Sequence, residues 1–177
     1  GQKWHGMMTL PRELKIKDGK IWQSPVKELE KYRKNPVTYK DQKISGSVLL
    51  EGISGRTIDM TVEFTGEISG EFSIDVAHNE MYTTTFTYYA EKHLLEIDRT
   101  YSGVDADVVC TRKIEIADKN SAPKLHFIMD RYSVEVFIND GEQVASTVIP
   151  TPVDADQIVF SNDNKCSVNI QKYEIEI

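Results

Sequence analysis

Three acidic positions in the 177-residue sequence could take part in chemistry, and each lies in or beside a strand-like stretch. Asp98 and Asp130 are each followed directly by an arginine, Arg99 and Arg131, and Glu135 follows within the stretch IMDRYSVEVFINDGE. Glycoside hydrolysis needs two carboxyl groups flanking the scissile bond, one of them with a raised pKa. An adjacent guanidinium group instead lowers the pKa of a carboxyl group. We therefore expect no catalytic residue among these positions.

Glu135 lies between two valines in a stretch whose hydrophobicity alternates with a period of two. Because successive side chains of a strand point to opposite faces, Glu135 and Phe137 share one face and Val134 and Val136 the other. The valines suit the core, so we expect Glu135 to be an exposed strand residue beside an arginine.

The sequence gives no indication of a metal or cofactor site. It contains no Gly-rich phosphate loop and no G-x-S-x-G motif. Two cysteines, Cys110 and Cys166, are too few for a zinc site or a disulfide framework. The four histidines also lack metal-ligand spacing: His5, His78, His93 and His126.

Charge divides the chain into two unlike parts. Residues 1–43 carry eleven Lys and Arg against five Asp and Glu, whereas residues 44–177 carry ten against twenty-three. An acidic main body argues against nucleic acid as a partner. No apolar run approaches the roughly 18–20 residues that a membrane span needs. The basic N-terminal part therefore reads as a separate structural unit.

From residue 44 onward the hydrophobic period is two, and we expect an all-β fold. About ten or eleven short strands separated by turn residues predict an antiparallel β-sandwich of the jelly-roll kind. A tight turn is expected at Asp130–Ser133 and a two-residue hairpin at Asp140-Gly141. The strongest alternating stretches are TIDMTVEF, EFSIDVA, KLHFIMD, SVEVFIN and NIQKYEIEI.

The N-terminal part predicts a hairpin followed by one short helix. Residues 4–23 form two extended runs around the turn signal Asp18-Gly19. Ser24 as N-cap, Pro25 at the first helical position and Asn35-Pro36 as the stop predict a helix over about 25–34. Three turns are too short to be stable alone, so this helix must dock on something.

Two stretches resemble a known family. WHGMMTLPRELKIKDGKIWQSPVKELEKYR (4–33) is similar to the junction between the two domains of the β-fructosidases of glycoside hydrolase family 32, and LHFIMDRYSVEVFINDGEQVASTVIP (125–150) to the signature of that family's C-terminal β-sandwich. LLEIDRTYSG (94–103) fits the same pattern. Laminin-G and concanavalin-like jelly rolls share similar hairpins. The family contains invertases, sucrose-6-phosphate hydrolases, inulinases and levanases, both intracellular and secreted.

The resemblance implies a division of the chain and a partner. Residues 1–12 would be the tail strand of an N-terminal β-propeller, residues 13–40 a linker with the helix, and residues 41–177 the C-terminal β-sandwich. The chemistry of the family is retaining hydrolysis of terminal β-fructofuranosides by three carboxylic residues of the propeller. Their motifs do not occur in this sequence, so no catalytic residue is carried over.

Two hypotheses follow for the function of the chain. In the first, it is a non-catalytic module that stabilises the propeller of the same chain and mediates oligomers. The propeller interface would then include Trp4, Met7, Met8 and Leu10. In the second, it is a carbohydrate-binding module for fructan or fructose. The polar groups expected to contact fructose hydroxyls are Asp98, Arg99, Asp130, Arg131 and Glu135.

Overall fold

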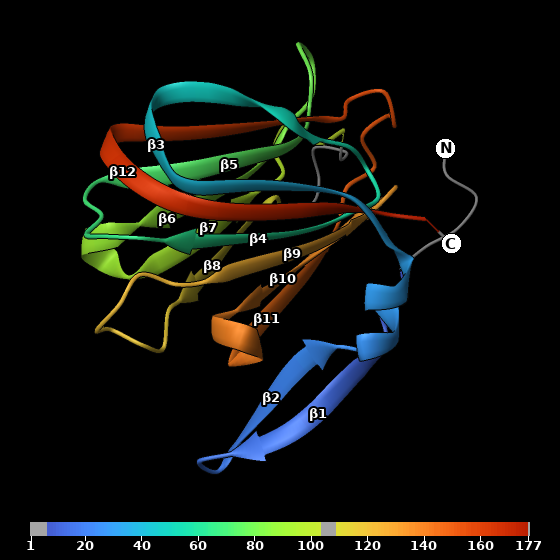
Figure 1. Cartoon of the computed structure of the whole chain (residues 1–177), viewed down its shortest axis with the longest axis vertical. Coiled ribbons are helices and arrows are strands. Elements are labelled where there is room, and N and C mark those ends of the chain that lie inside the picture. The colour runs from blue at the N-terminus through green and yellow to red at the C-terminus, as the bar shows by residue number, and fades with distance from the viewer. Residues whose placement is uncertain (1–6, 104–108, 177) are drawn as a thin grey trace.

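The structure, a computed structural model of the chain, describes residues 7–103 and 109–176. The described residues fold mainly into antiparallel strands, as predicted (Figure 1). Three short 3₁₀ helices interrupt them: η1 (Lys27–Tyr32), η2 (Ala90–Lys92) and η3 (Asn139–Gly141). The strands are β1 (Arg12–Lys17), β2 (Lys20–Pro25), β3 (Arg33–Ser54), β4 (Ile58–Phe64), β5 (Glu71–His78), β6 (Thr84–Tyr89), β7 (Leu94–Asp98), β8 (Thr111–Glu115), β9 (Leu125–Asp130), β10 (Ser133–Ile138), β11 (Gln143–Val148) and β12 (Gln157–Ile175).

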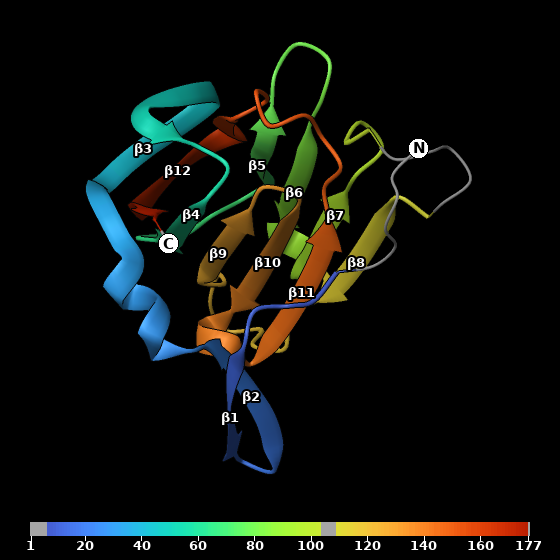
Figure 2. The same cartoon turned by 90° about the vertical axis from the view of Figure 1, so that its right-hand side faces the viewer.

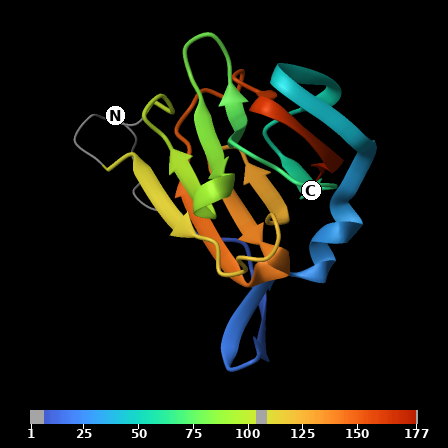
Figure 3. The ribbon, with the colours of Figure 1, turned by 90° about the vertical axis from the view of Figure 1, so that its left-hand side faces the viewer.

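Two layers face each other and share their longest strands. One layer runs β11-β10-β9-β4 and the other β8-β7-β6-β5, and β12 lies between β4 and β5 in the strand order. The first part of β12, residues 157–162, pairs with β5, and residues 168–174 pair with β4. Strand β3 follows β12 from end to end. Figure 3 shows β5–β8 in front of the orange strands of the other layer.

The sequence predicted short strands throughout, and the length of β3 and β12 differs from that prediction. β3 has 22 residues and β12 has 19. Their turn-like residues lie within the strands, where register shifts let each strand bend from one layer to the other. Four residues of β3 have positive φ for this reason: Asn35, Asp41, Gly46 and Gly52.

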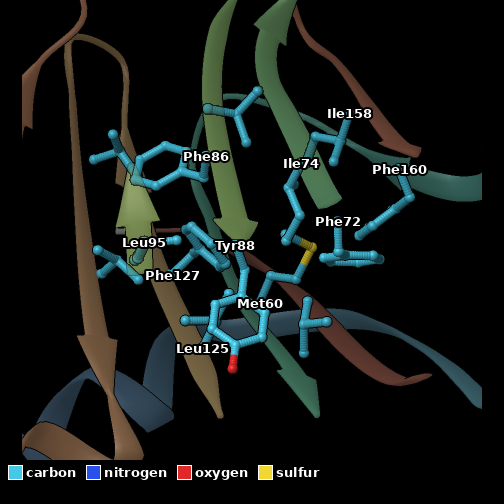
Figure 4. Close-up of a cluster of buried hydrophobic side chains, with 14 of the residues drawn as sticks. Met60, Phe72, Ile74, Phe86, Tyr88, Leu95, Leu125, Phe127, Ile158 and Phe160 are labelled. Atoms are coloured by element: carbon cyan, nitrogen blue, oxygen red, sulfur yellow. The ribbon is translucent and has the colours of Figure 1, made fainter. Parts of the chain in front are cut away.

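The apolar residues that alternate along the strands meet between the layers, and aromatic rings fill the centre (Figure 4). Phe86 of β6 meets Phe127 of β9 edge to face, with ring centroids 5.1 Å apart. Phe64 and Phe72 make a similar contact at 4.9 Å. Each fully buried side chain of this size stabilises the fold by about 1.5–3 kcal/mol.

The N-terminal hairpin forms as predicted and projects from the sandwich (Figure 1). Asp18 and Gly19 both have positive φ, which the two-residue turn between β1 and β2 requires. Gly141 of η3 packs against the base of β2, and a Cβ atom there would lie 1.9 Å from the carbonyl oxygen of Gln23. Only glycine fits this contact. The prediction of a two-residue hairpin at Asp140-Gly141 was wrong, because residues 139–142 together connect β10 to β11.

The linker helix is shorter and tighter than predicted. It is the six-residue 3₁₀ helix η1, and its N-cap is Val26 without a side-chain capping bond, not Ser24. Ser24 and Pro25 belong to β2 instead. Arg33 is already extended and pairs with Ile175 of β12. Strand pairing on both sides leaves too few residues for an α-helix, so tertiary contacts override local propensity.

Cys166 of β12 is buried in the core, and burial raises the pKa of its thiol to about 11. Because the thiolate is the reactive form, alkylation of Cys166 at pH 8 should be at least about 100-fold slower in the folded chain than in denaturant. Mass spectrometry of the peptide that contains Cys166, after timed labelling with iodoacetamide, measures this ratio. Equal rates in the two states would contradict the buried position.

Candidate functional site

Glu135 is buried on the outer face of β10, where the sequence predicted an exposed side chain. Its Oε1 atom accepts a hydrogen bond from the backbone N–H of Leu10 at 2.6 Å. Its Oε2 atom accepts from the guanidinium group of Arg12, with Nε at 3.2 Å, and from the Ser146 hydroxyl at 3.2 Å. The expected arginine neighbour is therefore present, but it lies 123 residues away in the sequence.

A second buried carboxylate lies on the same face. Asp59 of β4 accepts a hydrogen bond from Arg33 Nε at 2.8 Å and one from His126 Nε2 at 2.7 Å. Burial by itself would raise the pKa of Asp59. The hydrogen bond and charge of His126 and the charge of Arg33 outweigh that effect and hold the pKa below its ordinary value.

The two carboxylates lie in one row across the sheet. Ile128 of β9 pairs with Glu135 on one side and with Asp59 on the other. Paired residues of neighbouring strands point to the same face, so both carboxylates flank Ile128. Arg12 reaches one of them from the N-terminal segment and Arg33 reaches the other from the end of η1. We call these two ion pairs the linker clamp.

Each arginine of the linker clamp also covers an aromatic ring. The guanidinium carbon of Arg12 lies 5.5 Å from the ring centroid of Phe137, and that of Arg33 lies 5.0 Å from the centroid of Tyr173. Such cation–π contacts contribute about 0.5–2 kcal/mol each, depending on how far they are desolvated.

Apolar contacts close the space between the two ion pairs. Leu10 of the N-terminal segment and Leu29 of the linker pack on a small outer cluster formed by Ile128, Phe137 and Ile175. In Figure 2 the N-terminal segment crosses in front of β10 and β11 before it enters β1. The part of the outer face around Ile128 is therefore covered by the chain's own N-terminal segment and linker.

This arrangement binds the linker and leaves little scope for proton transfer. Both oxygens of Glu135 and both oxygens of Asp59 are occupied by donors of the same chain. Each carboxylate faces an arginine, and at Asp59 the charges of His126 and Arg33 favour the charged form. A general acid would need the opposite environment.

Asp98 and Arg99 lie where β7 ends and are not paired with each other in the contacts described. Asp98 Oδ1 accepts hydrogen bonds from the backbone N–H and the hydroxyl of Thr100, at 2.8 and 2.6 Å. Arg99 donates to the carbonyl oxygens of Val148 and Val109, at 3.0 and 3.3 Å. Arg99 thus links the edge of one layer to the other.

Asp130, the last residue of β9, and Arg131 lie at the predicted turn between β9 and β10. Both are exposed, and Asp130 Oδ1 accepts a hydrogen bond from the backbone N–H of Arg131 at 2.6 Å. The carbonyl oxygen of Arg131 accepts from the buried Arg56. The structure therefore brings four of the five proposed sugar contacts to one end of the sandwich and buries the fifth, Glu135, under the linker.

The proposed propeller-interface residues differ in exposure. Met8 is 95 % exposed, Met7 is half-buried, and Trp4 lies outside the described residues. Leu10 packs on the chain's own outer cluster and is half-buried. Leu10 therefore contacts the sandwich through its side chain and through its own backbone N–H, which donates to Glu135.

Sequence reasoning missed Arg12, Arg33, Asp59 and His126. Arg12 lies in LPREL and Asp59 in TIDMTVEF. A charged residue on the strand face opposite the apolar side chains is normally predicted to face solvent. The only available signal was the row of polar residues on the wet face, which does not reveal what covers it. Contacts between residues so distant in sequence follow only from the folded structure.

The described ranges, 7–103 and 109–176, contain neither a metal-binding cluster nor a membrane-spanning helix. No group of three or more His, Cys, Asp and Glu residues there could hold a metal ion. No helix there is both long and apolar enough to cross a membrane.

Solved structures share this fold. A sucrose-6-phosphate hydrolase from Lactobacillus gasseri superposes with a TM-score of 0.78 and 24 % identity, over 93 % of this chain and 33 % of that one. An exo-inulinase from Aspergillus awamori gives a TM-score of 0.77 and 22 % identity, over 95 % of this chain and 35 % of that one. The architecture is thus that of a β-sandwich domain within larger glycosidases.

The sequence assigns the family. The model for "Glycosyl hydrolases family 32 C terminal" matches residues 28–176, and the chain belongs to this family. A sucrose-6-phosphate hydrolase of Staphylococcus xylosus is 29 % identical over 98 % of this chain and 35 % of its own length. A levanase of Bacillus subtilis is 34 % identical over 82 % of this chain and 23 % of its own length. The chain therefore spans about a third or less of these relatives, and the predicted resemblance is confirmed.

Removal of one partner of the linker clamp tests its contribution to stability. Glu135→Ala leaves Arg12 and the Leu10 amide without their acceptor, and we expect the free energy of unfolding to fall by about 3–5 kcal/mol. Urea denaturation followed by tryptophan fluorescence measures the change. The matched control is Asp130→Ala at the exposed turn, which should change stability by less than about 0.5 kcal/mol. Similar losses in the two variants would contradict the clamp.

The low pKa of Asp59 predicts a pH-dependent stability. A carboxyl group whose pKa is lower in the folded chain than in the unfolded chain stabilises above the unfolded value, about 3.9, and that stability is lost as pH falls. The Asp59→Asn variant should therefore be less stable than the unsubstituted chain near pH 6. The difference in unfolding free energy between the two should become smaller below about pH 4. Denaturation midpoints from pH 6 to pH 2.5 measure this; a constant gap would contradict it.

Proposed function

We propose that this chain is the non-catalytic C-terminal module of a larger β-fructosidase. The parent enzyme would hydrolyse sucrose, sucrose 6-phosphate or a fructan in its N-terminal β-propeller, and the module would stabilise that domain. Support comes from the family and from longer relatives that are a sucrose-6-phosphate hydrolase and a levanase, of which this chain covers 35 % and 23 %. The proposed division is 1–12 as propeller tail, 13–40 as linker and 41–177 as sandwich, and Leu10 and Arg12 at the end of the tail are held on the sandwich by Glu135.

The exposed apolar face of the β1–β2 hairpin is the observation that carries this proposal. Leu14 and Ile16 alternate along β1, and Ile21 pairs with Ile16 across the turn, so all three share one face. They are 65 %, 83 % and 61 % exposed. The opposite face carries charged residues such as Lys15 and Lys17. An amphipathic two-stranded hairpin of this kind needs a further layer to bury its apolar face.

The base of the hairpin is held firmly, so its apolar face has a defined direction. Gly141 packs on the backbone of Gln23, and Arg12 Nη1 donates to Gln23 Oε1 at 2.9 Å. Nearer the turn, Lys20 forms an ion pair with Glu142 at 3.3 Å. The hairpin is therefore connected to the linker clamp through Arg12, which contacts both Gln23 and Glu135. A partner domain that docks on the hairpin is thereby fixed relative to the sandwich.

We also retain carbohydrate binding as a second proposal. Asp98, Arg99, Asp130 and Arg131 gather at one end of the sandwich, which supports a surface contact with fructan or fructose there. Glu135 would take no direct part, because the linker covers it. Fructan and fructose remain proposed partners on this basis.

The docking proposal predicts that the same substitutions act differently in two contexts. Ile16→Lys with Ile21→Lys should change the unfolding free energy of the isolated chain by less than about 0.5 kcal/mol, since both residues are exposed. In the full-length parent enzyme the pair should lower it by more than about 2 kcal/mol, because both apolar side chains would be buried there. Thermal and denaturant unfolding measure both.

One control variant and two contrary outcomes complete this test. Lys15→Ser with Lys17→Ser, on the opposite face of the hairpin, should change the unfolding free energy of the parent enzyme by less than about 0.5 kcal/mol. Self-association of the isolated chain through the hairpin, seen by sedimentation and abolished by the lysine pair, would favour an oligomer contact over propeller docking. Sucrose or levan cleavage by the isolated chain would refute the non-catalytic role.

A further inference from the structure

A pocket of about 510 Å³ opens at the end of the sandwich opposite the Asp130–Arg131 turn. Three segments form its walls: the loop after β4 with Gly66, Glu67 and Ile68, the η2 turn with Ala90, Glu91 and His93, and the loop with Asn120, Ser121 and Ala122. Phe64 and Tyr88 close it toward the core. Its size lies within the usual range for small-ligand sites. We call it the mouth pocket.

The walls of the mouth pocket are fixed by hydrogen bonds. Glu91 Oε1 accepts from the Gly70 N–H at 2.8 Å, and the Ala90 N–H donates to the Gly70 carbonyl at 3.0 Å. On the other side, Asp118 accepts from the Asn120 N–H at 2.9 Å and the Ser121 hydroxyl at 2.8 Å. The pocket is therefore preformed in the free chain, as ligand sites usually are.

Tyr88 supplies a polar group at the floor of the mouth pocket. Its side chain is almost fully buried among core residues, and Figure 4 shows its hydroxyl pointing away from the cluster. The nearest partner described is His93 Nδ1 at 3.4 Å, which is long for a hydroxyl hydrogen bond. A buried tyrosine hydroxyl normally has a close partner. This hydroxyl can therefore bond a ligand that enters the pocket.

The lining restricts the class of ligand. Phe64, Ile68 and Ala122 offer apolar contact, and Tyr88, His93 and Asn120 offer hydrogen bonds. Glu67 and Glu91 place negative charge at the rim, and no Lys or Arg is among the described lining residues. Hydrogen bonds hold the pKa values of Glu91 and Asp118 below their ordinary values, so both are charged at neutral pH. A phosphate group would be repelled here.

We propose that the mouth pocket binds one unit of a neutral saccharide. The apolar face of the sugar ring packs on Phe64 and Ile68. The sugar hydroxyls donate hydrogen bonds to the carboxylates of Glu67 and Glu91 at the rim, and one of them forms a hydrogen bond with the Tyr88 hydroxyl. Carboxylates accept well from sugar hydroxyls, and an apolar wall with a few placed polar groups is the usual makeup of such sites. The site is separate from the end that holds Asp98 and Asp130. Only the choice of fructosyl probes rests on the proposed function.

Titration of the isolated chain followed by amide NMR shifts tests the site. The probes are sucrose, fructose, a levan-derived oligosaccharide, glucose and sucrose 6-phosphate. We expect saturable shifts at residues 64–70, 88–93 and 117–122 with at least one neutral sugar, and weaker or no binding of sucrose 6-phosphate. Tyr88→Phe should weaken binding about five- to tenfold, which is the usual effect of losing one hydrogen bond.

A blocking variant keeps the test independent of folding. Ser121→Trp fills the rim at an exposed position and should abolish the shifts, whereas Ser47→Trp, exposed on β3, should leave them unchanged. Thermal unfolding checks that both variants fold. The proposal is overturned if no neutral sugar binds at tens of millimolar, if Ser121→Trp binds normally, if sucrose 6-phosphate binds more tightly than sucrose, or if shifts appear only near Asp98 and Asp130. None of these results depends on whether the hairpin docks.

Discussion

The linker clamp is the constraint on which the placement of the N-terminal part depends. Two carboxylates on an outer sheet face would normally remain in water, but Glu135 and Asp59 are buried. A buried carboxylate without a partner is strongly unfavourable, so each requires the arginine that the linker supplies. The linker therefore cannot leave the sheet without exposing apolar surface and separating two ion pairs. This makes the basic N-terminal part an extension of the sandwich rather than a flexible tether.

The same requirement explains why the hairpin is presented in one direction. β2 ends in the short turn that leads to η1, and η3 packs on its base through Gly141. The linker continues directly into β3, which begins at Arg33 and pairs with β12 along its whole length. Because β3 and β12 run through both layers, the linker is anchored to the strands that the two layers share. The exposed apolar face of the hairpin is thus attached to the most extensively paired part of the fold. A module that stabilises a neighbouring domain needs a rigid attachment of this kind.

Local patterns predicted much of the fold. Alternation identified the core faces of β4, β9 and β10, and Asp18-Gly19 located the first hairpin, because side-chain direction and turn conformation are local properties. Alternation also placed Glu135 opposite Val134 correctly, but it could not show that the linker would cover that face. The predicted strands were short, whereas Asp41 and Gly46, which both have positive φ, bend the long strand β3 instead of ending it. The mouth pocket depends on three loops that meet only in the folded chain.

The central claim is that the linker is an integral, clamped part of the isolated module. Hydrogen–deuterium exchange of the 177-residue chain tests it at the amide of Leu10, which donates to Glu135. The account predicts that this amide exchanges as slowly as the amides of β9 and β10, because it opens only when the module unfolds. Exchange of residues 8–12 at the rate of an unstructured peptide, with β9 and β10 still protected, would contradict it.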